Sequence, residues 1–122
     1  MAKRGSRDLK DRVLLQQRGV DDNGDRLGDW ETVPSSASDT AWAAQIIRLR
    51  GGETVMAQRL QGAQPVIIGL RASSVTRAVD SAWRAVDALT RQVYEIADAS
   101  EDDARQWIDV LAKAQAGDRL PA

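Results

Sequence analysis

Apolar and polar side chains alternate along the start of the chain, which is typical of a half-buried β-strand. Leu9, Val13 and Leu15 fall on one face of an extended segment, and the positions between them are mostly polar. Residues 19–29 contain three glycines among acidic residues and Asn, which favours turns with positive φ. Residues 30–33 resume an extended pattern. The pattern therefore predicts a long hairpin over residues 9–33.

A second extended segment follows a polar connector over residues 35–39. Trp42, Ala44 and Ile46 alternate with a second set that is also largely apolar, so we expect a strand buried on both faces. Gly51 and Gly52 end it, and residues 53–61 are rich in helix formers, which predicts a short helix or structured loop closing at Gly62. Pro65 then starts a β-rich run over residues 66–72.

The last third of the chain admits two interpretations from local pattern alone. Residues 82–89 and 92–97 form a hairpin if the turn lies at Thr90 and Arg91, although their alanine content also permits a helix over residues 78–97. Residues 100–103 have the form of a helix capping box, and apolar residues then recur at helical spacing before Gly117. The local pattern alone therefore predicts a helix over residues 101–116.

Composition narrows the possible functions. The chain has 122 residues, which suits one domain, and its 17 basic and 18 acidic side chains give a net charge of -1. It has no cysteine and no histidine, which excludes disulfides, thiolate metal sites and the commonest neutral-pH acid-base group. The acidic residues at 21–25 lack the spacing of a calcium loop, so we expect no metal and no cofactor. A carboxylate hydrolase would need paired acids, and no spacing indicates them.

The ends of the chain and its hydropathy suggest where it works. No apolar run approaches the ~18 residues that span a bilayer, so we expect synthesis in the cytoplasm and no membrane partner. We expect a flexible basic tail over residues 1–7, with Lys3, Arg4 and Arg7 able to reach a phosphate or an acidic subunit. The domain is expected over residues 8–117, followed by a C-terminal tail over residues 118–122.

Three groups of residues are candidates for function. Residues 48–61 carry three arginines against one glutamate between glycine hinges, although a plain surface excursion remains an alternative. Asp21, Asp22, Asp25 and Asp29 form an acidic group that could dock on a basic neighbour or simply serve as turn residues. The four tryptophans invite a base-stacking reading, but core packing or a subunit interface is the better interpretation of Trp30, Trp42 and Trp83.

The order of these segments resembles the head-tail joining, or head closure (stopper), proteins of long-tailed phages and gene transfer agents. The resemblance covers residues 8–115. It rests on the first strand, the turn that ends at Trp30, the strand that opens on Trp42-Ala43, the loop over residues 51–59, and Val93-Tyr94-Glu95-Ile96 in the place of the penultimate strand.

The resemblance implies a mainly β protein, a small antiparallel β-barrel or sandwich of about six strands with a long inserted loop or short helix. It favours strands over residues 82–97 and a last strand over residues 105–112. In that strand Trp107, Asp109 and Leu111 would face opposite to Ile108, Val110 and Ala112.

The resemblance also implies a function without catalysis. Copies of the chain would form a six- or twelve-fold ring that joins the portal or adaptor ring to the tail terminator or tail tube, and closes the channel on packaged double-stranded DNA in the virion. The closing loop would comprise Gly51, Gly52, Glu53, Thr54, Val55, Met56, Ala57, Gln58 and Arg59, with Arg48, Arg50 and Arg59 facing DNA. Alternatives are a tail terminator or other tail-completion ring protein, or a nucleic-acid-binding β-barrel module.

Overall fold

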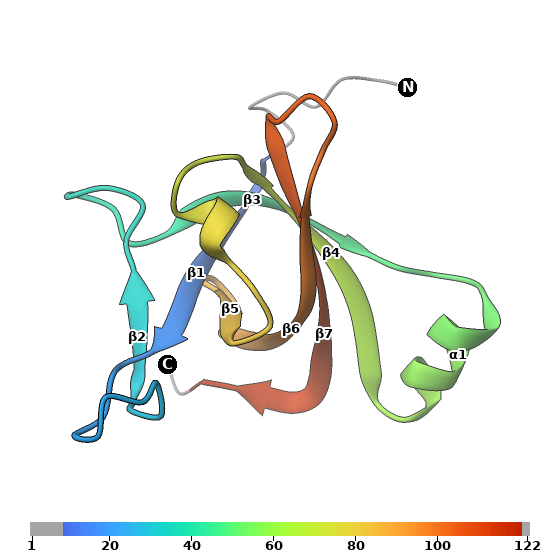
Figure 1. Cartoon of the computed structure of the whole chain (residues 1–122). Helices are drawn as coiled ribbons and strands as arrows, with labels where there is room; N and C mark the ends of the chain where they lie inside the picture. The colour runs from blue at the N-terminus through green and yellow to red at the C-terminus, as the bar shows by residue number, and fades with distance from the viewer. Residues whose placement is uncertain (1–8, 121–122) are drawn as a thin grey trace.

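A computed structural model describes residues 9–120, and the expected basic tail over residues 1–7 lies outside them. Figure 1 shows a mainly β molecule with one short α-helix set to the side. The strands are β1 (Asp11–Arg18), β2 (Trp30–Val33), β3 (Trp42–Arg48), β4 (Ala63–Arg71), β5 (Trp83–Asp87), β6 (Gln92–Glu101) and β7 (Trp107–Arg119). The helix α1 covers Glu53–Leu60, and a short 3-10 helix, η2, covers Thr76–Ala78.

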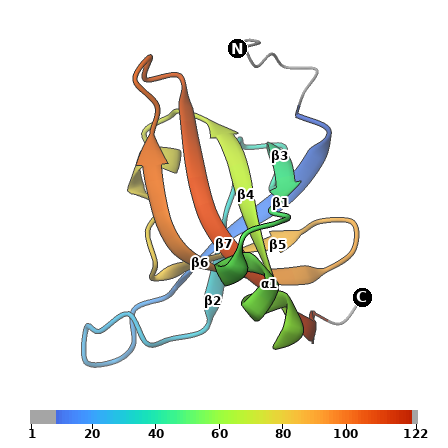
Figure 2. The same ribbon diagram turned by 90° about the vertical axis from the view of Figure 1, so that its right-hand side faces the viewer.

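Six of the strands close into an antiparallel barrel. They follow the order β1-β3-β4-β7-β6-β5, and pairing of β5 with β1 completes the circle. Figure 2 views this wall from the side of α1, with β4 and β7 adjacent. The prediction of a small antiparallel β-barrel of about six strands with an inserted loop or short helix is confirmed.

Strand β1 joins the barrel to the one strand outside it. The first residues of β1 pair with β3 along one edge, where Val13 lies opposite Trp42. The last residues of β1 pair with β2 along the same edge, where Leu15 lies opposite Val33. The other edge pairs with β5. The predicted hairpin over residues 9–33 is confirmed, and its turn residues project beyond the barrel as a loop.

The core is formed by the side chains that alternate inward along the strands. Its largest fully buried members are aliphatic, and they come from β1, β4, β5 and β7: Leu15, Ile68, Leu70, Val13, Val66, Val86 and Val110. The expectation for the last strand also holds, because Ile108, Val110 and Ala112 are buried in the barrel while Leu111 is exposed. Period-two alternation therefore predicts the inward face of β1, and the resemblance predicts that of β7.

Strand β3 corrects one expectation. We expected burial on both faces because both sets of residues are largely apolar. The structure buries Ala44, but Ala43 is exposed and Ile47 is 45% exposed. The described chain places no element over this part of the outer wall, so apolar side chains there face solvent. The β4 strand also starts earlier than predicted, at Ala63, with Pro65 inside it.

The capping-box sequence makes a hairpin turn between β6 and β7. The Asp102 carboxylate accepts backbone N–H groups from Gln106 (2.8 Å) and Trp107 (3.1 Å), and the Asp102 N–H donates to the carbonyl of Trp107 at 3.0 Å. A side chain that caps a helix can satisfy the same donors in a turn. The strands predicted from the resemblance are therefore correct, and the local prediction of a helix is wrong. The last strand, β7, continues beyond the predicted end at residue 112 to Arg119, so it enters the expected C-terminal tail over residues 118–122.

Candidate functional site: an arginine-bearing excursion and an acidic loop

The chain leaves the barrel between β3 and β4 in an excursion over residues 49–62 that carries α1. Its base is tied to the wall, because the Leu49 N–H donates to the Pro65 carbonyl at 3.0 Å and the Gln64 side-chain amide donates to the Leu49 carbonyl at 2.9 Å. Gly51 and Gly52 have φ values of 87° and 80°, which glycine adopts at little cost. Two consecutive glycines thus turn the chain away from the strand.

The helix itself is weakly anchored. Its described side chains are all exposed, with Met56 47% and Leu60 85% exposed. It contacts β4, and Gly62, with a φ of 84°, ends it and returns the chain to the wall. In Figure 1 it stands clear of the barrel on the right of the view. Such a segment adds little to the hydrophobic core, so its position is held mainly at its base.

The structure separates the three arginines of this region. Arg48 ends β3, and Arg48 and Arg50 line a 490 Å³ hollow at the barrel mouth with Asp11, Asp87 and Tyr94. Arg59 lies instead in the last turn of α1, where a positive side chain also complements the negative end of the helix dipole. All three are exposed. The base of the excursion therefore has two arginines beside two aspartates, and its helix carries Arg59.

Tyr94 is the buried polar group at this mouth. Burial raises the pKa of its phenol, Asp87 raises it further, and Arg48 opposes the shift. Burial of the neutral phenol beside a carboxylate makes its ionisation unfavourable at neutral pH. The sequence places Tyr94 in the penultimate strand but does not bring it near Arg48, because β3 and β6 line the same hollow only once the barrel closes.

The acidic group lies in the loop between β1 and β2, which the structure shapes closely. The Asp21 carboxylate accepts the N–H groups of Asn23 and Asp25, both at 2.9 Å. Gly19 and Gly28 bond across the loop's base at 3.0 Å. A Cβ on Gly28 would lie 3.0 Å from the Gly19 carbonyl oxygen, so the two segments fit only because Gly28 lacks a side chain.

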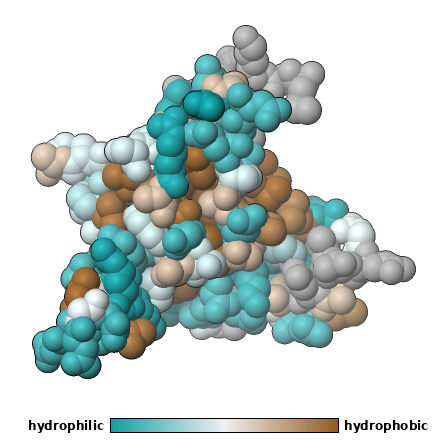
Figure 3. All heavy atoms as spheres, viewed as in Figure 1, coloured by the Kyte–Doolittle hydropathy of each residue, from teal (hydrophilic) through white to brown (hydrophobic). Residues whose placement is uncertain are grey.

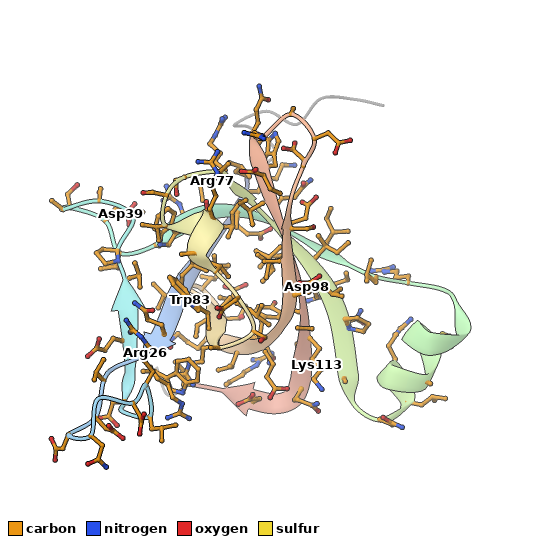
Figure 4. The ribbon with its side chains drawn as sticks, viewed as in Figure 1. Arg26, Asp39, Arg77, Trp83, Asp98 and Lys113 are labelled. Carbon is orange, nitrogen blue, oxygen red and sulfur yellow. The ribbon has the colours of Figure 1, made fainter. Side chains whose placement is uncertain are left out.

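The other three aspartates of this loop, Asp22, Asp25 and Asp29, are exposed. We refer to residues 19–29 as the acidic loop. Figure 4 labels Arg26, its one basic residue, whose guanidinium donates to the Arg18 carbonyl at 3.3 Å. Turn chemistry accounts for Asp21 and the glycines, and it leaves the exposed carboxylates available to a partner.

Two arginine side chains stack on the Trp30 ring, an arrangement that the sequence does not predict. The guanidinium carbons of Arg18 and Arg84 lie 4.7 Å and 4.5 Å from the Trp30 ring centroid. Burial is the main cause of a lowered pKa for Arg84, which Asp118 opposes and Arg18 reinforces. Arginine nevertheless stays charged at neutral pH. The stack places two cations over the Trp30 ring, which agrees with a packing role for this side chain.

The other tryptophans are structural. Trp42 and Trp83 are partly buried and pack against the core, and the Trp42 indole N–H donates to the Val33 carbonyl at 2.8 Å. Trp107 is buried, and the Arg71 guanidinium carbon lies 5.1 Å from its ring. These positions agree with the interpretation of the tryptophans as packing residues.

Within the described residues, His, Cys, Asp and Glu side chains form no group of three or more that could hold a metal ion. Across residues 9–120, a helix with the length and apolar character to cross a membrane is absent.

Comparison with known proteins points to one family. A family model described as phage head completion protein matches residues 5–115. The comparison with curated proteins finds no match.

Two solved structures share the fold. Protein SF1141 from Shigella flexneri 2a has a TM-score of 0.57 and 17% sequence identity, and the match covers 88% of this chain and 94% of that one. A chain in the virion of a native gene transfer agent particle has a TM-score of 0.55 and 19% identity, and the match covers 91% of this chain and 94% of that one. Identities this low show a shared fold.

Proposed function

Because the chain belongs to the phage head completion protein family, we propose that it is a structural component of the junction between the head and the tail of a phage-like particle. It works in the virion after synthesis in the host cytoplasm, and it catalyses no reaction. Its fold is also found in a chain of a gene transfer agent virion, which supports a place in such a particle.

In this proposal, copies of the chain form a ring of six or twelve. One face of the ring meets the portal or adaptor ring, and the other meets the tail terminator or the tail tube. Heterologous contacts close a ring when the rotation between copies returns to the start, and repetition makes weak contacts strong together. Double-stranded DNA occupies the channel.

The excursion is the part of the chain that closes this channel. The observation that carries this proposal is that residues 49–62 are tied to the barrel at their base, while the described side chains of α1 are exposed. A segment tied only at its base can take two positions without disturbing the core. One position blocks the channel over packaged DNA, and the other opens it for delivery.

The arginines supply the attraction to DNA. Arg59 is the foremost phosphate-facing residue because it lies on the helix away from the barrel, and Arg48 and Arg50 extend the positive surface toward the base. Contacts of arginine with the DNA backbone do not depend on base sequence and weaken as salt rises. A protein that closes a channel on DNA of any sequence needs contacts that do not depend on the bases.

The test replaces residues 53–60 by a Gly/Ser linker of the same length. Heads carrying this variant should fill with DNA and then lose it, measured as nuclease sensitivity of DNA in purified heads. The isolated variant should keep the circular dichroism of the β-barrel, because α1 adds little to the core. Arg59→Gln alone should give a milder leak that worsens with salt.

The matched control is a Gly/Ser linker in place of residues 35–38, which are exposed and polar but lie outside the excursion. Heads with the control should retain DNA normally. If heads with the α1 replacement retain DNA normally, the excursion does not close the channel, and the proposed place of the chain at the head-tail junction still stands. An unfolded α1 replacement would show instead that the excursion belongs to the core.

A further inference from the structure

The helix of the excursion carries two apolar side chains that the barrel core does not use. Met56 and Leu60 are four residues apart in α1, so they lie on one face of the helix. Met56 is 47% exposed and Leu60 is 85% exposed. Figure 3 shows apolar spheres at lower right, where α1 lies in Figure 1. The helix therefore gains stability wherever this face becomes covered.

A hollow of 330 Å³ opens at the end of the barrel beside the excursion. Its lining includes Gly62 and Gln64, at the return of the excursion, and Thr90 in the turn between β5 and β6. Two buried residues, Val66 of β4 and Tyr94 of β6, give it apolar surface as well. Figure 2 is seen from the side of α1 and shows the helix at the end of the barrel where β4 begins. The excursion thus forms part of the rim of this hollow.

The opposite rim carries a second exposed leucine. Leu89 is 88% exposed and directly precedes Thr90. The turn that holds it has a defined shape, because the Asp87 carboxylate accepts the N–H groups of Leu89 at 2.8 Å and Thr90 at 3.0 Å. Exposed leucines therefore stand beside the hollow on both sides, Leu60 two residues before Gly62 and Leu89 next to Thr90.

The polar groups of the hollow do not prevent an apolar cover. The side-chain amides of Gln64 and Gln92 already donate to backbone carbonyls. The charged residues in the lining are Arg48, Arg119 and Asp87, and the two arginines are exposed while Asp87 is half-buried. Long arginine side chains keep their charged ends in water while their stems cover apolar surface. A leucine placed against Val66 therefore buries no unpaired charge.

Glycines at both ends of the excursion provide the hinges. Gly51, Gly52 and Gly62 all have positive φ, and a Cβ on Gly51 or Gly52 would meet nothing within 4 Å. The hydrogen bonds that tie the base involve Leu49 and Pro65, which lie outside the segment bounded by these glycines. Rotation at the glycines therefore swings α1 while the base stays bonded to the wall.

We propose that the excursion folds over the hollow as a lid, with Leu60 between Val66 and Leu89, and that this is its withdrawn position. The inference rests on the proposed function, because it names where the excursion goes when the channel opens. Arg59 precedes Leu60 and leaves the channel with it. Apolar burial holds the lid shut, and any partner that binds α1 in the channel competes with that burial.

Disulfide formation in the full-length chain tests the lid, since the chain has no native cysteine. A variant with Leu60→Cys and Leu89→Cys is oxidised at low protein concentration. It should form an intramolecular disulfide, seen as a faster-migrating monomer on a non-reducing gel. The matched control combines Leu60→Cys with Leu27→Cys, which is exposed in the acidic loop. The rate should exceed that of the control at least about tenfold, because the hinges raise the effective concentration only at Leu89.

A nitroxide on Leu60→Cys gives a second readout that traps nothing. Closure should broaden the amide signals of Leu89 and Thr90 more than that of Leu27. Equal broadening at Leu27, or equal disulfide rates in the two double variants, would overturn the lid. All these positions are exposed, so the substitutions leave the core intact.

The link between the lid and the channel is tested in heads that carry the Leu60→Cys and Leu89→Cys variant. Heads assembled under reducing conditions and then oxidised should lose DNA to nuclease, whereas heads kept reduced should retain it. A disulfide that forms in heads that still hold their DNA would show that the lid is not the withdrawn position. The first two readouts use the isolated chain, so their failure removes the lid and leaves the proposed channel closure standing.

Discussion

The acidic loop and the excursion are both departures from one barrel, and each has a glycine with positive φ that turns the chain, but only the acidic loop has a pair of glycines in close contact at its base. Gly19 and Gly28 lie where two segments touch, and a Cβ on Gly28 would lie 3.0 Å from a backbone oxygen. Gly51 and Gly52 have positive φ, and a Cβ on either would meet nothing within 4 Å. The first pair permits close contact, and the second pair permits a change of direction.

This difference separates a loop that is held in one shape from an excursion that is bonded to the wall only at its base. The Asp21 carboxylate and the backbone hydrogen bonds of Gly19 with Gly28 and Asp29 give the acidic loop a defined shape. The excursion is bonded to the wall at its base and exposes its helix. A docking surface gains affinity from a preorganised shape, whereas a gate needs an element that can move.

The largest effect should come from removing the side chain that shapes the acidic loop. We expect Asp21→Ala to lower the free energy of unfolding by about 1–2 kcal/mol, because two backbone N–H groups lose their acceptor. Urea denaturation measures this. Asp22→Ala is the matched control, since Asp22 is exposed and should change stability by less than about 0.5 kcal/mol. Equal effects at both positions would mean that the loop is not held by Asp21.

Asparagine and alanine scanning at two glycines should separate their roles. Gly51→Ala should cost about 1 kcal/mol because Gly51 has a φ of 87°, and Gly51→Asn should cost less because asparagine tolerates this conformation. Gly28→Ala should also destabilise, but Gly28→Asn should be no better, since bulk is the obstacle there. Rescue by asparagine at Gly28 would contradict the distinction. Thermal unfolding of the four variants decides between these outcomes.

The smallest effect concerns the barrel mouth where the excursion begins. The pKa of Tyr94 is raised above its ordinary value of 10.0, mainly by burial. The neutral phenol therefore favours the folded state below about pH 10, and that stability is lost as the pH rises through the higher folded pKa. Melting temperatures of the wild type and Tyr94→Phe, followed between about pH 9 and 11, should show a steeper alkaline decline for the wild type. Parallel declines would contradict the assignment.

The candidate site was predictable in part. Glycine pairs, helix formers and an arginine surplus placed the excursion correctly in the chain, because those are local properties. The stack of Arg18 and Arg84 on Trp30 was not predictable, since it needs β1 to pair with β2 on one edge and with β5 on the other. The alignment of three apolar side chains on the outer face of β3, β4 and β7 was missed for the same reason. It exists only once Ile47, Ile67 and Leu111 fall into register.

The strands of the first hairpin and their buried faces follow from the sequence, because alternation and turn chemistry act over neighbouring residues. Over residues 100–112, pairing between distant strands prevailed over a local pattern that favoured a helix. There the Asp102 carboxylate satisfies the donors of a turn, and Ile108, Val110 and Ala112 complete the barrel core. Pairing with β4 and β6 satisfies the backbone as a helix would, and it also buries these side chains, which outweighs helix propensity.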